Sequence, residues 1–329
     1  MTGSLLALVS ALIVTGLVVS VLIAGALAKD GLRRRYPPAG RLVDVGGYRL
    51  HVRVEGEGAP TVVLDAGAGG VGLLWELVRP ALARRTRVVT YDRAGLGWSA
   101  PSPRPRTADV MAEELHTLLT RAAIPGPYLL VGWSLGGSVV RQFAARYADT
   151  VAGLVLVDSA HEHQMRRLPQ TLVRMLGAMT TPLRGLQALA RLGLLALNPA
   201  LIPVDGANRL PADVVAAIRG RIASGGEHVE ALLAETAAVA AARTEPVRTL
   251  GDLPLIVLSH GQLPPEAVPP SLGPSVRAEY EETWQALQLE LTALSTRGRR
   301  IVAARSGHNI PLEEPELVID AVHSLLAAA

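Results

Sequence analysis

The sequence predicts an α/β fold in which a mostly parallel sheet is covered by helices on both faces. Three observations lead to this prediction. Short apolar segments of strand length alternate with longer segments of helical period along most of the chain. Several of the short segments are apolar at every position, as are strands buried on both faces of a parallel sheet. Glycine-rich or polar motifs directly follow the apolar segments, and in such sheets ligands bind where the strands end.

The expected strands begin with a hairpin. Residues 41–45 and 48–54 alternate in polarity on either side of Gly46-Gly47, which is a two-residue turn signal. The later strands are short and apolar, and right-handed crossovers would join them. They are expected at residues 61–64, 86–91, 128–131, 152–157, 254–259 and 300–304.

Segments with helical spacing separate these strands. Thr107 and Asp109 are candidate N-caps, and Pro315 suits the first turn of the last helix. The expected helices cover residues 73–84, 107–122, 137–147, 278–294 and 315–328.

Strand signals are absent between residues 162 and 250. Amphipathic segments rich in Leu, Ala and Arg replace them, and prolines and paired glycines interrupt these segments. The pattern predicts a helical insertion within the α/β domain. The chain therefore divides into an N-terminal segment at 1–40, a core in two parts at 41–161 and 251–329, and the insertion at 162–250.

Residues 5–28 form an almost continuous apolar run without a charged side chain. As a helix with a rise of about 1.5 Å per residue, this run spans a hydrocarbon layer of about 30 Å. Residues 1–4 carry no basic side chain, and the run is long for a signal peptide, so we expect an uncleaved single-pass anchor. The basic cluster from Lys29 to Arg35 predicts a cytoplasmic catalytic domain, because positive charge beside a span prefers that side. Export after cleavage near Ala28 is the alternative.

Composition excludes several classes of protein. The chain has 329 residues, of which 49% are hydrophobic, enough to bury a full core. It contains no cysteine, which excludes disulfides, a cysteine nucleophile and thiolate metal sites. The net charge is +3 and no long basic block occurs, so we expect no nucleic-acid partner.

The candidate nucleophile is Ser134, in the sequence Gly132-Trp133-Ser134-Leu135-Gly136. An apolar strand precedes this motif and a helix follows it, which is the context of a nucleophile elbow. The glycines two residues before and after the serine avoid collisions at a sharp turn. The N–H group of Leu135, at the start of the helix, can donate to a developing oxyanion. A glycine-rich turn with a capping serine is the alternative interpretation.

A nucleophilic serine needs a base and an orienting acid. His308 is the candidate base, because it follows the last strand in a glycine-flanked loop. His260, after an earlier strand, is a second candidate. Asp158, at the end of the strand at 152–157, is the candidate acid, and Glu266 is the alternative acid.

The loop at residues 65–70 is the candidate oxyanion loop. Its small side chains let the backbone approach a ligand, and the N–H of Ala68 would act together with that of Leu135. A tight turn with no catalytic role is the alternative. The candidate substrate-binding residues are Gly67, Gly69, Trp133 and His161.

Two charged residues, Asp92 and Arg93, directly follow the strand at 86–91. We expect them to form a structural ion pair or hydrogen bonds that brace the loop.

The motifs together resemble those of the α/β-hydrolase fold superfamily, from about residue 41 to residue 328. The matching pieces are LDAGAGG, YDRAGLGWS, GWSLGG, LVLVDSAH and SGHNI, in the order serine, acid, histidine. The resemblance implies a triad of Ser134, His308 and an acid, with the N–H groups of Ala68 and Leu135 as the oxyanion hole. It also implies that residues 162–250 form a lid over the site.

The chain departs from the family pattern in two places. The loop after the strand at 254–259 lacks the aspartate that most members use as the acid, while some members place the acid at the position of Asp158. Ala66 replaces the usual histidine of the oxyanion loop, which a backbone donor does not require.

The sequence therefore predicts a membrane-anchored serine hydrolase that cleaves carboxylic esters through an acyl-enzyme on Ser134. The apolar insertion suggests hydrophobic or lipid-like substrates, and the mechanism requires no metal and no organic cofactor. An amidase or aminopeptidase, a thioesterase and a cofactor-free haloperoxidase-like perhydrolase are alternatives on the same triad. A catalytically silent receptor or scaffold is the alternative from another class.

Overall fold

The computed structural model describes residues 2–178, 180–241, 244–265 and 268–328. Its centre is an eight-stranded sheet with the order β1-β2-β4-β3-β5-β6-β7-β8. The strands are β1 (Arg41–Asp44), β2 (Arg49–Glu55), β3 (Thr61–Asp65), β4 (Val88–Tyr91), β5 (Tyr128–Trp133), β6 (Val151–Val157), β7 (Leu255–His260) and β8 (Gly298–Ala303).

Strand pairing confirms the predicted mostly parallel sheet. β1 and β2 form an antiparallel hairpin, and β2 also pairs antiparallel with β4. The pairs from β4 through β3, β5, β6 and β7 to β8 are all parallel. In the hairpin turn Gly46 and Gly47 have φ values of 122° and 97°, which glycine adopts without strain. Since all parallel strands run in one direction, the segments that follow them meet at one edge of the sheet.

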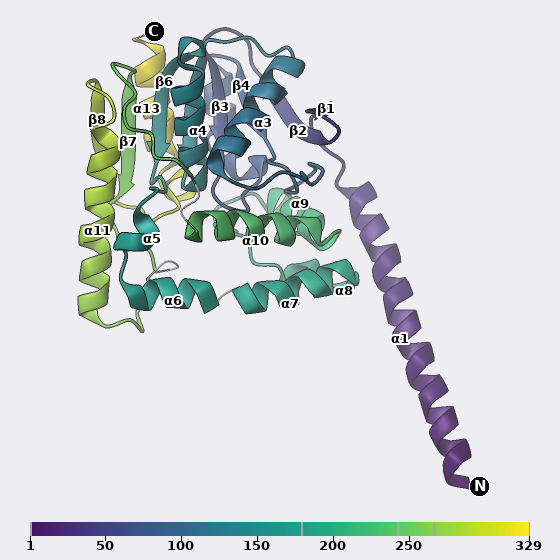
Figure 1. The fold of residues 1–329 in the computed structure, drawn as a ribbon. Helices are drawn as coiled ribbons and strands as arrows, with labels where there is room; N and C mark the ends of the chain where they lie inside the picture. Colours follow the sequence, from purple (N-terminus) through teal and green to yellow (C-terminus); the bar gives the residue numbers. More distant parts are fainter. Residues whose placement is uncertain (1, 179, 242–243, 266–267, 329) are drawn as a thin grey trace.

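Helices cover both faces of the sheet, as the alternating pattern predicts. α3 (Ala108–Arg121), α4 (Leu135–Arg146) and α11 (Pro274–Thr292) contribute to one apolar layer, which includes Val63 and Leu130. α2 (Arg79–Ala83) and α13 (Pro315–Leu326) contribute to the other, which includes Val62 and Leu129. Side chains of neighbouring strand residues therefore point into opposite layers, and both layers are buried (Figure 1).

The helix predicted at residues 73–84 is wrong in its continuity. The structure has a short 3₁₀ helix, η1 (Gly72–Trp75), and then α2, with turns between them. Pro80 lies in the first turn of α2 and has no N–H to donate to a preceding helical turn. Trp75 and Leu82 are nonetheless buried. The apolar spacing therefore correctly predicts which side chains are buried, whereas the proline prevents one continuous helix.

Every element that the structure describes between β6 and β7 is helical. These are α5 (Gln164–Arg167), α6 (Gln170–Ala178), α7 (Thr180–Arg191), α8 (Leu194–Leu197), η3 (Pro199–Leu201), α9 (Ala212–Ala223) and α10 (Glu227–Ala240). We call α5 to α10 the inserted helices. Figure 1 shows α10 next to the core, with α6, α7 and α8 as an outer layer. The inserted helices therefore stand over one end of the sheet.

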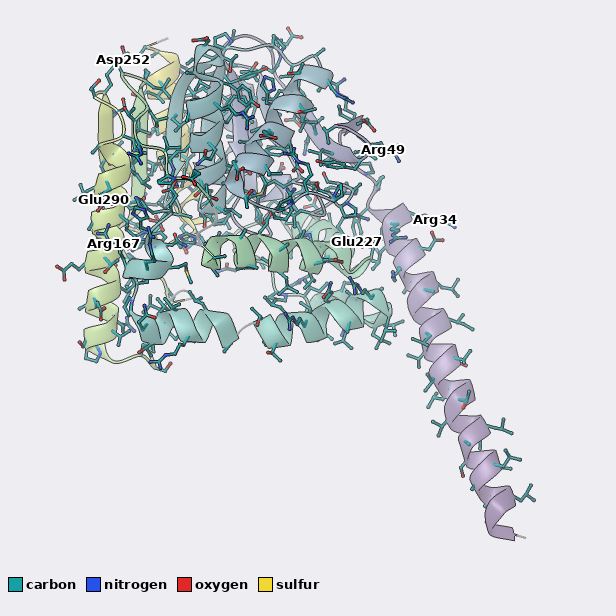
Figure 2. The ribbon with its side chains drawn as sticks, in the orientation of Figure 1. Arg34, Arg49, Arg167, Glu227, Asp252 and Glu290 are labelled. Carbon is teal, nitrogen blue, oxygen red and sulfur yellow. The ribbon has the colours of Figure 1, made fainter. Side chains whose placement is uncertain are left out.

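α1 (Thr2–Arg35) extends away from the domain as a single long helix (Figure 1). Its side chains from Leu5 to Ala24 are exposed, and Figure 2 shows almost only carbon atoms along this part. α1 has the length and composition to cross a membrane. Its last turns contact α8 and α9, and directly after the helix Trp98 Nε1 donates to the carbonyl oxygen of Tyr36 at 2.9 Å.

The last helix of the chain, α13, begins at Pro315, in agreement with the prediction. It is preceded by the short α12 (Ile310–Glu313), which follows the loop that carries His308. The loop therefore lies between β8 and the short α12, after the carboxyl end of the strand.

Candidate active site

Ser134 occupies a strained turn between β5 and α4. Its backbone has φ 53° and ψ −119°, a conformation that residues with a side chain rarely adopt. The Ser134 N–H donates to the Val157 carbonyl oxygen at 3.0 Å, and the Ala160 N–H donates to the Ser134 carbonyl oxygen at 2.9 Å. The end of β6 thus holds the turn from both sides.

The two flanking glycines are required by close backbone packing. A Cβ atom on Gly132 would lie 2.5 Å from the Gly136 carbonyl oxygen. A Cβ atom on Gly136 would overlap the Asp65 carbonyl oxygen and lie 2.7 Å from that of Ala66. Because these contacts are to backbone atoms, a rotamer change cannot relieve them. The crowding predicted for this motif is present.

Asp158 lies at the end of β6 and is fully buried. Its carboxylate accepts hydrogen bonds from His308 Nδ1 at 2.6 Å and from Trp284 Nε1 at 2.8 Å. It also accepts from the backbone N–H of His260 at 3.1 Å. Burial alone would raise the pKa of Asp158, but the hydrogen bonds and charges of His260 and His308 lower it well below its usual range. Asp158 is therefore placed to act as an anion that orients the His308 ring.

The side chain of Trp133 connects the His308 loop to the serine turn. Trp133 Nε1 donates to the His308 carbonyl oxygen at 2.9 Å, and the two rings are 6.0 Å apart. Within the described residues, the Ser134 hydroxyl makes no side-chain hydrogen bond. The structure therefore places serine and histidine on neighbouring segments, while the proton transfer between them belongs to the function proposed below.

His260 binds the same carboxylate from the other side. Its Nδ1 lies 2.9 Å from Asp158 Oδ2, and its Nε2 lies 3.1 Å from Glu281 Oε2 on α11. Burial opposes a charge on His260, but the hydrogen bonds and charges of Asp158 and Glu281 raise its pKa to about 9. With both nitrogens bonded to carboxylates, His260 has no free nitrogen to act as a base toward Ser134.

The sequence does not predict that two carboxylates bind His260. It indicates His260 only as a second candidate base, because the residue directly follows the apolar strand expected at 254–259. Asp158 follows β6 and Glu281 lies within α11, and only the parallel pairing of β6 with β7 brings Asp158 beside His260. α11 then packs on β7 and supplies Glu281.

Arg93 braces the loop at residues 65–70. Its guanidinium donates to the carbonyl oxygens of Ala66 and Gly67, each at 2.6 Å. It also pairs with Asp65 at 2.6 Å and with Glu235 of α10 at 2.8 Å, and all three side chains are buried. Arg93 thus fixes the loop and ties it to the inserted helices.

Asp92 and Arg93 have separate partners. Asp92 accepts from the Gly72 N–H at 2.8 Å and pairs with His51 Nδ1 at 2.9 Å. Both residues therefore brace loops, as one of the two predicted roles requires. Arg93 forms its ion pairs with Asp65 and Glu235, and not with Asp92.

The loop at residues 65–70 lies against the nucleophile. A Cβ atom on Gly67 would be 3.3 Å from Ser134 Cβ. The Gly69 N–H donates to Glu235 Oε2 at 2.9 Å, so it is already engaged. Ala68, between them, is exposed. Its N–H makes no backbone hydrogen bond within the described residues, so it is free to donate to a ligand.

The matches to known proteins agree with this geometry. A model of the alpha/beta hydrolase family matches residues 62–321, which is most of the chain.

The chain belongs to the alpha/beta hydrolase family.

Individual relatives of this hydrolase resemble it to different extents. It is 26% identical over 275 residues to the uncharacterized protein YqjL of Bacillus subtilis, covering 84% of this chain and 87% of that protein. It is 38% identical over 136 residues to the probable transporter efuK of Hormonema carpetanum, covering 39% of this chain but only 20% of that protein. A solved esterase from Thermogutta terrifontis has a TM-score of 0.59 at 23% identity, over 88% of this chain and 98% of its own. The last similarity concerns the fold alone.

The remaining candidate residues of this hydrolase have different surroundings. Trp133 is buried and packs edge-on against Trp75, so its ring belongs to the apolar core next to Ser134. Gly69 faces α10, where Leu232 is its nearest neighbour. His161 lies 3.5 Å from Glu290 of α11, and burial lowers its pKa to about 4. His161 is therefore neutral near pH 7.

Glu266, the alternative acid, lies outside the described residues.

Proposed function

We propose that this hydrolase cleaves carboxylic esters of hydrophobic compounds through an acyl-enzyme on Ser134. The observation that carries the proposal is the 2.6 Å hydrogen bond between Asp158 Oδ2 and His308 Nδ1, beside the strained serine turn. Asp158 would hold the proton on Nδ1, which leaves Nε2 as the basic nitrogen. Asp158 is thus the proposed acid, in preference to Glu266.

The proposed reaction uses groups of this chain at each step. His308 Nε2 takes the proton of the Ser134 hydroxyl, and the oxygen attacks the ester carbonyl carbon. The N–H groups of Leu135 and Ala68 stabilise the resulting oxyanion, and one such donor is worth about 10²–10³ in kcat. The alcohol leaves with the proton from His308, and a water activated by the same ring then hydrolyses the acyl-enzyme.

Residues 162–250 are proposed to be a lid that gives the site its apolar character. Leu232 of α10 covers the oxyanion loop at Gly69. Leu168 and Leu172 pack with Trp284, whose ring lies 6.1 Å from that of His308. Apolar side chains thus surround both ends of the proposed site, which favours a hydrophobic acyl or alcohol group.

Residues 1–40 are proposed to be a retained membrane anchor and linker, with the catalytic domain on the cytoplasmic side. Contacts on both sides of Ala28 support retention over cleavage. Gly25 packs against Gly193 of the lid, and Trp98 binds the backbone of Tyr36. A signal peptide removed near Ala28 would leave the first of these contacts unmade.

An active-site-directed fluorophosphonate tests the mechanism directly. It should label the full chain in detergent, and Ser134→Ala should abolish labelling. Ser102→Ala is the matched control, because Ser102 is a partly exposed serine bonded to Glu114 away from the elbow. If the folded wild-type chain is not labelled, the proposed nucleophile is wrong, and a silent scaffold becomes the better description.

A substrate panel separates ester cleavage from its alternatives. p-Nitrophenyl esters of increasing chain length, an anilide, a peptide and a thioester should be compared on wild type and Ser134→Ala. We expect the highest kcat/KM with esters of medium or long acyl chains. A higher kcat/KM for the anilide, the peptide or the thioester would replace the ester proposal with that activity, and perhydrolysis is measured by adding peroxide to an acetate buffer.

A further inference from the structure

The backbones of Gly25 in α1 and Gly193 are in close contact. This contact fixes the position of the inserted helices along the axis of α1. A Cβ atom on Gly25 would lie 2.9 Å from the Gly193 carbonyl oxygen, and one on Gly193 would lie 2.7 Å from the Gly25 carbonyl carbon. One turn further along α1, Lys29 Nζ donates to the Arg191 carbonyl oxygen at 3.3 Å. The turn between α7 and α8 therefore sits directly on α1.

The position of Gly25 along α1 coincides with a membrane boundary. Residues 5–24 are exposed and apolar, and at about 1.5 Å per residue they extend about 30 Å, the thickness of the hydrocarbon layer. Gly25 is buried against Gly193, and the first charged side chain, Lys29, follows one turn later. If residues 5–24 span the bilayer, Gly193 must lie at the level where hydrocarbon meets head groups.

Exposed leucines lie close to Gly193 in α7, in the turn that follows it and in α8. We call three of them the corner leucines, with exposed fractions of 42% for Leu189, 50% for Leu192 and 47% for Leu197. Figure 1 shows α7 and α8 in the outermost layer of the domain, on the side toward which α1 extends. Soluble surfaces seldom gather large apolar side chains in this way, whereas a surface against acyl chains requires them.

We propose that the α7–α8 corner lies in the surface of the membrane that α1 spans, with the corner leucines in contact with the acyl chains of the adjacent leaflet. The occupant of this apolar surface is thus the lipid bilayer, because the surface is continuous with the anchor through the Gly25–Gly193 contact. The inference rests on the proposed anchor. It places the inserted helices at the bilayer, so that esters dissolved in the leaflet are the substrates nearest to the lid.

Depth measurements with single cysteines test this placement. The wild-type chain has no cysteine, so one cysteine at Leu192 or Leu197 can carry an environment-sensitive nitrobenzoxadiazole label without background. Labelled full chains are reconstituted in phosphatidylcholine–phosphatidylglycerol vesicles that contain lipids spin-labelled near the head group or near the acyl-chain end. Leu12 of α1 is the deep reference, and Leu289, a 55% exposed leucine on α11, is the aqueous reference. A far-ultraviolet circular dichroism spectrum equal to that of the wild-type chain verifies that each variant is folded.

We expect blue-shifted emission at Leu192 and Leu197, with quenching mainly by the shallow spin label. Leu12 should be quenched mainly by the deep label, and Leu289 by neither. If Leu192 and Leu197 behave like Leu289 while Leu12 is deeply quenched, the inference is overturned and the anchor stands. If Leu12 is also in water, the anchor proposal fails and takes the inference with it.

A pair of glycine variants tests whether the contact with α1 sets the depth. Gly25→Leu should reduce shallow quenching at Leu192, because the added side chain collides with the Gly193 backbone. Gly16→Leu is the matched control, since among the described residues only neighbouring atoms of α1 itself lie within 4 Å of a Cβ atom at Gly16. Quenching that is equal in both variants would overturn the role of the glycine contact.

Discussion

Replacing His260 by glutamine should remove a large part of the pH dependence of stability. His260 is fully buried, with one nitrogen on Asp158 and the other on Glu281. Burial favours the neutral ring, but the two carboxylates outweigh burial and raise the pKa from 6.5 to about 9. Glutamine can keep one of the hydrogen bonds but carries no charge, so His260→Gln removes the titration.

The magnitude and sign follow from the difference between folded and unfolded chains. The rise of the pKa from 6.5 to about 9 corresponds to stabilisation on the order of 3 kcal/mol. Between these pH values the folded chain keeps a proton that the unfolded chain releases, so the free energy of unfolding falls as pH rises. The contribution of His260 is present in full below pH 6.5 and is lost as pH passes about 9.

The assay is urea unfolding of the full chain in detergent micelles, followed by tryptophan fluorescence, at pH values from below 6.5 to above 9. The wild-type curve should decline by about 3 kcal/mol more than that of His260→Gln. Glu281→Gln should give an intermediate decline, because Asp158 still pairs with the ring. Equal declines in wild type and His260→Gln would refute the argument that His260 is charged in the folded chain.

Three further predictions concern the serine and its surroundings. Asp158→Asn should lower kcat for ester hydrolysis by about 10⁴-fold, because His308 loses the correct tautomer. Fluorophosphonate labelling should slow in parallel, and wild-type rates in this variant would contradict the assignment of Asp158 as the acid. Gly136→Ala should cost about 1–3 kcal/mol or prevent folding, because its Cβ atom meets backbone, whereas Gly177→Ala in α6, with no neighbour within 4 Å, should cost nothing in the same urea titration. Glu235→Ala should lower the free energy of unfolding by about 3–5 kcal/mol, because it leaves a buried arginine short of a partner. Glu230→Ala, on the same helix but in an exposed ion pair, should change it by less than about 1 kcal/mol, and equal losses would contradict this distinction.

Local signals in the chain were sufficient for the architecture. Fully apolar short segments predicted the parallel strands, and the structure confirms the sheet and the helices on both faces. The glycines around Ser134 predicted a sharp turn, because a steric requirement on the backbone is visible in the residue types themselves. The order of motifs after the strands predicted that Ser134, Asp158 and His308 would share one edge.

Only the tertiary structure decided which partner each buried charge selects. Asp158 pairs with His308 and also with His260, which is 102 positions away, and Arg93 pairs with Glu235, 142 positions away. Such choices depend on strand register, on the direction of each side chain and on burial, and none of these is encoded in local spacing. The contact of Gly25 with Gly193 likewise needs the packed positions of α1 and α8. The sequence alone thus determined the framework and the edge at which the chemistry lies, and long-range packing determined the hydrogen bonds and ion pairs that would make a site there work.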